Sequence, residues 1–360
     1  GVQTCALPIY YTDQVYKMQK TFALSLTVNP ERQAAIEIER LLKFPGFLKR
    51  DSFAKGRVEI VELRVDERSR LCNVALSELN RVIKCRVLVC AVLRRGDVVA
   101  PDGSFVLREG DRIFVTASTE SLATLLDNLG IITKKVNHVM ICGGGRVSYY
   151  LAQQLEKDGM TVRLIEKDPK HCEELAALLP KTEIINDDAS NTFVLKRENL
   201  ESCDALVTAT GMDELNMIIS LYGTKHGVSQ VITKLGHMEN GSMIDQLPIG
   251  STIWPKDLCC NGIVRYIRAM HNQTGAAVSV HSIADGKAEA IEFHVEEKKP
   301  YCDKPLKNMK VKQNILVACI THGGVTELPG GDSVIREGDT VVVVTTRNDI
   351  IYKLDDIFEA

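Results

Sequence analysis

Residues 137–168 contain the pattern that most restricts the fold. They read as an apolar strand, a glycine turn, a helix, a second apolar strand and a carboxylate. Gly143 permits the sharp turn from strand to helix, and Gly145 lets the backbone approach a pyrophosphate, which also meets the free N–H groups at the helix N-terminus. Glu166, about 20 residues beyond the glycines, can accept hydrogen bonds from ribose hydroxyls. The pattern therefore predicts a dinucleotide site.

Strands and helices alternate from residue 136 to residue 271, which predicts an α/β fold with a Rossmann-like, doubly wound parallel sheet. Ligands bind such sheets at the carboxyl ends of the strands. The predicted strands are 138–142, 161–166, 182–186, 205–209, 230–234 and 251–253. The predicted helices are 147–158, 170–179, 191–198, 214–226, 238–246 and 256–271.

Three further loops end at the same edge of the predicted sheet. Asp188 follows the third strand and can contact an adenosine, and either Asp188 or Ser190 can cap the next helix. Ala209 and Thr210 follow the fourth strand, where small residues leave room for a ligand. Lys234 ends the fifth strand and either reaches a phosphate or extends into solvent.

The predicted cofactor-binding residues combine the glycine loop with these strand ends. For Glu166 the alternative is that it only caps the helix after it. A dehydrogenase would also need a general acid or base and an anion clamp. The eight histidines are scattered singly, and each is expected to be a surface or packed residue, so no catalytic or metal site is predicted. The cofactor-binding set is Gly143, Gly144, Gly145, Arg146, Val147, Glu166, Asp188, Ala209, Thr210 and Lys234.

Composition excludes several classes of protein. The chain has 360 residues, 45% hydrophobic and 25% charged, which suits a soluble globular protein of two or three domains. The net charge of -3 gives no global attraction to nucleic acid or anionic lipid. The eleven cysteines form no C-x-x-C pair or Cys/His array, which favours reduced thiols of a cytosolic protein. No apolar run reaches the roughly 18–20 residues needed to cross a bilayer, so a membrane role would require a partner.

A small α+β module occurs twice in the chain. Both copies contain R-E-G-D after a short apolar strand, at Arg108–Asp111 and Arg336–Asp339. Each copy follows an amphipathic helix that is introduced by a strand and a proline, with the strand of the first copy expected at 26–30. The matching segments are 88–111 with 316–339 and 56–65 with 286–295.

The repeat suggests a division of the chain in which the first half retains only the last part of a nucleotide-binding domain. Residues 1–9, GVQTCALPI, are expected to be the translated read-through of a sequencing adapter. The remaining segments are 10–48 as the remnant of a first N-domain, 50–131 as the first small module, 136–271 as a second N-domain and 278–360 as the second small module.

Several motifs in one order, together with the repeated REGD module, are similar to those of the TrkA family of Trk-type potassium uptake regulators. The motifs are ICGGGRV, RLIEKD, DDAS, LVTATGMDELN and VITKL, and the resemblance covers residues 10–360. Members of this family are built from tandem RCK (KTN) domains, with Rossmann-like N-domains that bind nucleotides and small α+β C-domains. The resemblance implies phosphate contacts from Gly143 to Val147, a ribose contact at Glu166 and an adenosine contact at Asp188, with Ala209 and Thr210 beside the ligand.

Three positions depart from the family pattern. Ser148 replaces the usual third glycine or alanine. Asp187 stands where a glycine is common and is expected to add negative charge near the phosphates. Lys234 occupies a position where the family often has arginine, so a phosphate role is implied there. Because the first half has no glycine loop, the chain is expected to hold at most one nucleotide site.

The resemblance implies a cytosolic regulatory subunit that is not an enzyme and binds NAD, NADH, ATP or ADP. It would assemble as a homo-oligomer, a dimer or a tetrameric ring, at the inner face of the plasma membrane. There it would gate a TrkH/TrkG-type membrane potassium transporter subunit, and no nucleic acid partner is expected. Two alternatives stay open: an NAD-dependent oxidoreductase, and an RCK-type regulator of another cation channel or antiporter.

Overall fold

The computed structural model divides into two compact units. The described part of the first lies within residues 26–42 and 136–263, and that of the second within 43–135 and 264–359. The expectations for residues 1–25, and the predicted helix at 238–246 apart from Ile244, lie outside the described residues. The structure describes residues 26–43, 47–54, 57–66, 69–129, 135–236, 244, 247–270, 277–346 and 351–359.

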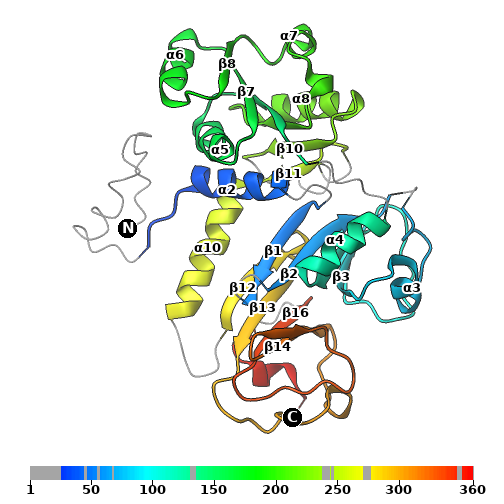
Figure 1. Cartoon of the computed structure of the whole chain (residues 1–360). Coiled ribbons are helices and arrows are strands. Elements are labelled where there is room, and N and C mark those ends of the chain that lie inside the picture. Colours follow the sequence, from blue (N-terminus) through cyan, green and yellow to red (C-terminus); the bar gives the residue numbers. More distant parts are fainter. Residues whose placement is uncertain are drawn as a thin grey trace. The chain divides into compact units, whose positions relative to one another are not determined.

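The first unit is built on a six-stranded sheet in which every neighbouring pair of strands is parallel. The order is β11-β10-β9-β6-β7-β8, so successive strands are added to one side of β6 up to β8 and to its other side from β9 onward. Figure 1 labels β7, β8, β10 and β11 of this sheet. This strand order confirms the Rossmann-like fold class, and each predicted strand lies within one residue of the observed one. The strands are β6 (His138–Cys142), β7 (Thr161–Glu166), β8 (Glu183–Asn186), β9 (Ala205–Thr208), β10 (Gln230–Lys234) and β11 (Ser251–Ile253).

Helices cover both faces of this sheet. Along β6, Val139 and Ile141 pack in the core formed with α2, α5 and α6, whereas Met140 and Cys142 pack in the core formed with α7 and α8. Burial on both faces explains why this strand is a continuous apolar run. The helices of this unit are α2 (Pro30–Lys43), α5 (Arg146–Lys157), α6 (Pro169–Leu178), α7 (Thr192–Arg197), η4 (Leu200–Ser202) and α8 (Asp213–Lys225). Helix α10 (Pro255–Met270) begins in this unit, and its residues from Val264 on belong to the second.

Helix α2 comes from the first half of the chain but packs on the core of this parallel sheet. Its buried residues include Ile38 and Leu41. Pro30 occupies the first helical position, and the side chain of Asn29 accepts a hydrogen bond from the N–H of Arg32 at 2.9 Å. The strand predicted at 26–30 is wrong, because Pro30 begins the helix and the preceding residues form its cap, with no sheet neighbour among the described strands.

The second unit contains two five-stranded antiparallel sheets with equivalent strand order, β1-β2-β5-β3-β4 and β12-β13-β16-β14-β15. The first module comprises β1 (Lys49–Phe53), β2 (Val58–Arg64), η3 (Leu76–Glu78), α3 (Leu79–Ile83), β3 (Leu88–Arg94), β4 (Asp97–Val99), β5 (Arg112–Ala117) and α4 (Thr119–Asn128). The second comprises β12 (Ala277–Ile283), η5 (Ala284–Gly286), β13 (Ala288–His294), η6 (Leu306–Asn308), β14 (Ile315–His322), β15 (Val325–Glu327), β16 (Thr340–Thr345) and η7 (Leu354–Ile357).

The two modules share a hydrophobic core. Phe53 and Phe114 of the first module belong to the same buried cluster as Ile283 of the second. Nearby, Asp51 Oδ1 lies 2.9 Å from His281 Nδ1. These two residues occupy equivalent positions of the repeat, five residues before Gly56 and Gly286. The repeat thus pairs with itself, and an acid and a histidine face each other where the copies meet.

Candidate functional site

Gly143 brings two loops into contact at the point where the strand order reverses. Its φ is +98°, and a Cβ atom there would lie 2.8 Å from Thr210 Cα in the loop after β9. The N–H of Gly143 donates to the carbonyl of Ile165 at 2.9 Å. Only glycine satisfies both the positive φ and this close approach of backbone to backbone.

Glu166 holds the glycine loop through its carboxylate. Oε2 accepts a hydrogen bond from the N–H of Gly144 at 2.7 Å, and Oε1 accepts one from the N–H of Asp168 at 2.9 Å. The N-cap of α6 is Asp168, whose own carboxylate accepts from the first turn of that helix, so the alternative of Glu166 as its cap is wrong. A carboxylate has about four acceptor positions, which leaves Glu166 acceptors for ribose hydroxyls.

The N-terminus of α5 is open to an anion. Its N-cap is Gly145, which has no side chain to cap the helix, and Arg146 and Val147 begin the first turn. The first N–H groups of a helix have no partner within the helix, so this end attracts phosphate. Arg146 lies 3.5 Å from Glu31 of α2, and both side chains are partly exposed. Ser148, in the third-glycine position, is fully buried, and its Oγ has no partner among the described residues.

The loop after β8 is organised by its own carboxylates. Asp187 pairs with Arg197 at 2.9 Å, which offsets the negative charge expected near the phosphates. Asp188 Oδ1 accepts from the N–H of Ser190 at 2.9 Å, and the backbone and side chain of Ser190 lower the pKa of Asp188. The alternative of Asp188 or Ser190 as the cap of α7 is wrong, because Asn191 accepts the capping hydrogen bond.

The loops after β9 and β10 are tied together through Asn216. The N–H and hydroxyl of Thr210 donate to Asn216 Oδ1 at 2.9 and 2.7 Å, and Asn216 Nδ2 donates to the carbonyl of Lys234. Lys234 Nζ donates to the carbonyl of Thr210 at 2.7 Å, so a lysine extended into solvent is ruled out. Burial lowers the pKa of Lys234, against the opposite effect of Asp213 and Glu31. Ala209, adjacent to Thr210, is buried.

Two residues beside the site were missed by the sequence analysis. Asn216 is fully buried in α8, and the available signal was a polar side chain on the face that covers the sheet, which it shares with Ser220. His171, the third residue of α6, was expected to be an ordinary surface or packed histidine. Its Nε2 lies 2.8 Å from the carbonyl oxygen of Gly144. His171 and Gly144 are 27 residues apart in the sequence, whereas Asn216 contacts Thr210, six residues away, and Lys234, 18 residues away.

The residues at this sheet end fit the pyrophosphate and ribose of a dinucleotide. The N-terminus of α5 has no side-chain cap and could receive the pyrophosphate, and Glu166 retains acceptors for hydroxyl groups. Within the described ranges, no group of three or more His, Cys, Asp or Glu side chains could hold a metal ion. None of the described helices is both long and apolar enough to span a bilayer.

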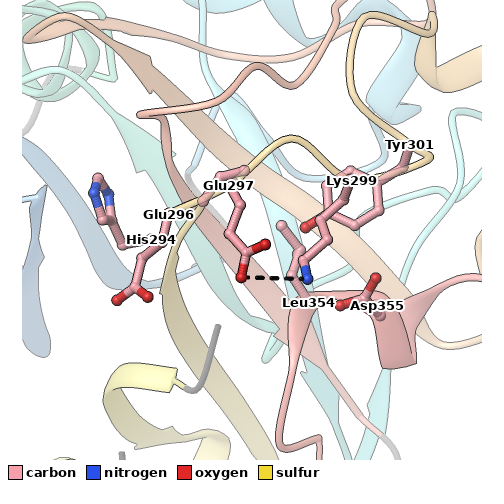
Figure 2. A pocket seen from close by; sticks show the side chains of 8 residues that line it. His294, Glu296, Glu297, Lys299, Tyr301, Leu354 and Asp355 are labelled. Carbon is pink, nitrogen blue, oxygen red and sulfur yellow. Dashed lines mark ion pairs between the residues drawn. The ribbon is translucent and has the colours of Figure 1, made fainter. Parts of the chain in front are cut away.

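A separate pocket belongs to the second small module (Figure 2). Glu297 and Lys299 approach each other across it, with 3.9 Å between Oε1 and Nζ. Tyr301 also lines this pocket, and burial raises the pKa of its hydroxyl. None of the predicted nucleotide-binding residues lines it, so it has no part in the site at the parallel sheet.

A Rossmann-like domain with a dinucleotide loop, followed and preceded in sequence by small α+β modules, defines an RCK-type protein. Residues 139–255 match the TrkA-N domain, and residues 60–130 and 290–358 match the TrkA-C domain. The chain is 26% identical to Trk system potassium uptake protein TrkA homolog 1 of Methanosarcina mazei, over 92% of this chain and 73% of that protein. It is 27% identical to Trk system potassium uptake protein TrkA of Haemophilus influenzae, over 92% and 72%. The chain belongs to the TrkA family.

Solved structures show the same fold at low sequence identity. The GsuK RCK domain superposes with a TM-score of 0.53 at 14% identity, covering 91% of this chain and 69% of that one. The GsuK channel bound to NAD superposes with a TM-score of 0.51, also at 14% identity, covering 91% and 58%. These matches support the fold of the parallel sheet and of the small modules.

Proposed function

We propose that the chain is a regulatory subunit of a Trk-type potassium uptake system that binds NAD or NADH at the glycine loop. The observation that supports this most directly is the hydrogen bond from Gly144 to Glu166, because it holds the carboxylate that we propose as the ribose acceptor beside the uncapped N-terminus of α5. The names of the relatives point to potassium uptake, and one structure of the same fold is bound to NAD.

The proposed ligand contacts come from the loops that follow β6, β7, β8, β9 and β10. The N–H groups of Gly145, Arg146 and Val147 would bind the pyrophosphate, and Glu166 the ribose. Asp188 would contact the adenosine side. Lys234, with Ala209 and Thr210, would line the opposite wall, where its ammonium already meets the carbonyl of Thr210. Like NAD and NADH, ATP and ADP contain an adenosine joined to phosphates, so they would compete for this site.

Regulation would work through differential affinity. A nucleotide shifts a gate only as far as it binds one arrangement of the subunits better than another. The proposed partner is a TrkH/TrkG-type membrane potassium transporter subunit, and the proposed assembly is a homo-oligomer at the inner face of the plasma membrane. A membrane partner of a different channel or antiporter type is the nearest alternative, since RCK domains also occur in the GsuK channel.

Calorimetric titration of the full chain with NADH, NAD, ATP and ADP tests the proposal. Micromolar binding of at least one of them, with no loss of NADH absorbance over hours, is the expected result. Binding of none would contradict the assignment of the glycine loop. Steady oxidation of NADH in the presence of a carbonyl substrate would instead favour the oxidoreductase.

A further inference from the structure

His171 contacts two acceptors at once. Its Nε2 lies 2.8 Å from the carbonyl oxygen of Gly144, and its Nδ1 lies 3.3 Å from Oε2 of Glu174. A carbonyl oxygen and a carboxylate can only accept hydrogen bonds. Both ring nitrogens must therefore bear a proton for the two contacts to form together, and the ring that makes them is an imidazolium.

The same peptide unit is held from its other side. The N–H of Gly144 donates to Glu166 while its carbonyl accepts from His171, so an acid and a histidine together fix the middle of the glycine loop. The carboxylates that face the ring are Glu174 on its own helix and Glu166 at the end of β7, whereas the glycine loop contributes only the carbonyl. Burial of the ring opposes its charge, but the Gly144 carbonyl, Glu174 and Glu166 together raise the pKa of His171.

We propose that His171 is a positioning residue of the phosphate-binding loop, and that its protonation strengthens nucleotide binding. This inference rests on the proposed function of the same site. The protonated ring orients the Gly144 peptide and places a positive charge behind the loop that would bind the pyrophosphate. Loss of the proton removes either the contact to Gly144 or the one to Glu174 and also removes the charge.

The sign of the pH dependence follows from the raised pKa. A group whose pKa is raised in the binding site contributes fully to binding at low pH, where it is protonated. This contribution to the binding free energy is lost as the pH rises through the raised pKa. Because the ordinary histidine pKa is about 6.5, the change falls in the neutral to mildly alkaline range. A bound pyrophosphate would favour the protonated ring further, so binding should take up protons near neutral pH.

The test is a titration of the full chain with NADH from pH 6.0 to pH 8.5 at fixed ionic strength. NADH is the suitable probe, because its pyrophosphate diester does not titrate in this range, whereas a terminal phosphate has a pKa of about 6. The affinity for NADH is expected to fall about five-fold across the range. A hydrogen bond that involves a charged group is stronger than a neutral one by about this factor in the binding constant. Calorimetry in two buffers with different ionisation heats measures the protons taken up.

Three variants separate the role of His171 from a merely structural one. His171→Gln keeps a neutral N–H donor and should bind NADH with the affinity of the wild type at high pH, without pH dependence or proton uptake. His171→Arg keeps the positive charge and should bind tightly up to pH 8.5. His138→Gln, at an exposed histidine at the start of β6, should behave like the wild type. Thermal melting of each variant confirms that it is folded.

The outcomes distinguish the two proposals. If the wild type binds NADH equally at every pH, or if His171→Gln retains the full pH dependence, the role of His171 is wrong and the nucleotide site stands. If the wild type binds no NADH at any pH, the nucleotide site itself is wrong, and the role of His171 falls with it.

Discussion

The small modules and the parallel sheet both use carboxylates to hold backbone N–H groups, but in different surroundings. In the modules, Asp111 and Asp339 are 1% and 3% exposed, and each accepts a hydrogen bond from the backbone three residues earlier. Each also pairs with a side chain at the equivalent position of the repeat, Arg94 or His322. Glu166 at the end of β7 is only half-buried and accepts from two backbone N–H groups.

This difference separates carboxylates that close a turn from one that can meet a ligand. A buried carboxylate must be paired and hydrogen-bonded to offset its desolvation, and Asp111 satisfies this with Arg94 and its own turn. At 1% exposure, Asp111 is also out of reach of a ligand. Glu166 is half-buried and has acceptor positions beyond its two backbone contacts, so the repeated R-E-G-D motif marks a folding element, whereas the acid after β7 belongs to the candidate site.

The largest expected effect is on the fold, from Asp111→Ala. The substitution leaves Arg94 and the N–H of Arg108 without their shared partner in a buried position. We expect the free energy of unfolding to fall by about 3 kcal/mol, since removing one member of a buried pair costs about 3–5 kcal/mol and Arg94 can partly reach water. Urea denaturation followed by circular dichroism measures this.

The control for this prediction lies in the same module. Asp102 is exposed and accepts from the N–H of Ser104 in a surface turn. Asp102→Ala should leave the free energy of unfolding almost unchanged, because the side chain is exposed and its loss strands no buried partner. Equal losses in the two variants would show that burial and pairing do not distinguish Asp111.

The next effect concerns the contact between the loops at the parallel sheet. Gly143→Ala places a Cβ atom 2.8 Å from Thr210 Cα, so the loops must separate. We expect NADH affinity to fall at least about ten-fold, together with a loss of about 1–3 kcal/mol in stability from the positive φ and the clash.

Gly159→Ala is the matched control. Gly159 also has a positive φ, +77°, but no atom lies within 4 Å of the Cβ position. This variant has the backbone strain without the clash, so it should lose some stability and keep its NADH affinity. If both variants lose affinity alike, general destabilisation rather than loop contact explains the effect.

The smallest effect tests the divergence between the two modules. His322→Arg would give Asp339 the same type of partner that Arg94 provides for Asp111. Because the histidine is already within hydrogen-bond distance, the expected gain in unfolding free energy is below about 1 kcal/mol. The reverse change, Arg94→His, should cost a similar amount in urea denaturation. A loss on His322→Arg would mean that the two turns differ in more than this partner.

The sequence predicts the strands of the parallel sheet well, because most of them are short apolar runs next to glycine, proline or acidic residues. The sequence predicted that a glycine is required at position 143 for the turn from strand to helix. It did not predict that Gly143 lies against Thr210 in the loop after β9. The segment 187–191 contains four residues of a type that can cap a helix, Asp187, Asp188, Ser190 and Asn191. The local pattern therefore could not identify Asn191 as the cap of α7. Pro30 made residues 26–30 look like a strand end, whereas it begins α2.

The roles of Asn216 and His171 could not be read from periodicity. Each depends on a side-chain rotamer that reaches a backbone carbonyl or N–H group in another loop. Helical spacing places Asn216 on the buried face of α8, but it does not reveal that Thr210 and Lys234 meet it there. These contacts link loops at the ends of different strands and form only in the assembled sheet.

The assignment of Glu166 to a nucleotide site is tested most directly by comparing Glu166→Ala with Glu173→Ala in a calorimetric titration with NADH. Glu173 is an exposed carboxylate on α6, close in sequence to the site. We expect Glu166→Ala to weaken NADH binding about ten-fold or more, since a hydrogen bond to a charged group contributes about 1.5–3 kcal/mol, and Glu173→Ala to bind like the wild type. Unchanged affinity in a folded Glu166→Ala variant would contradict the claim that this carboxylate belongs to a nucleotide site.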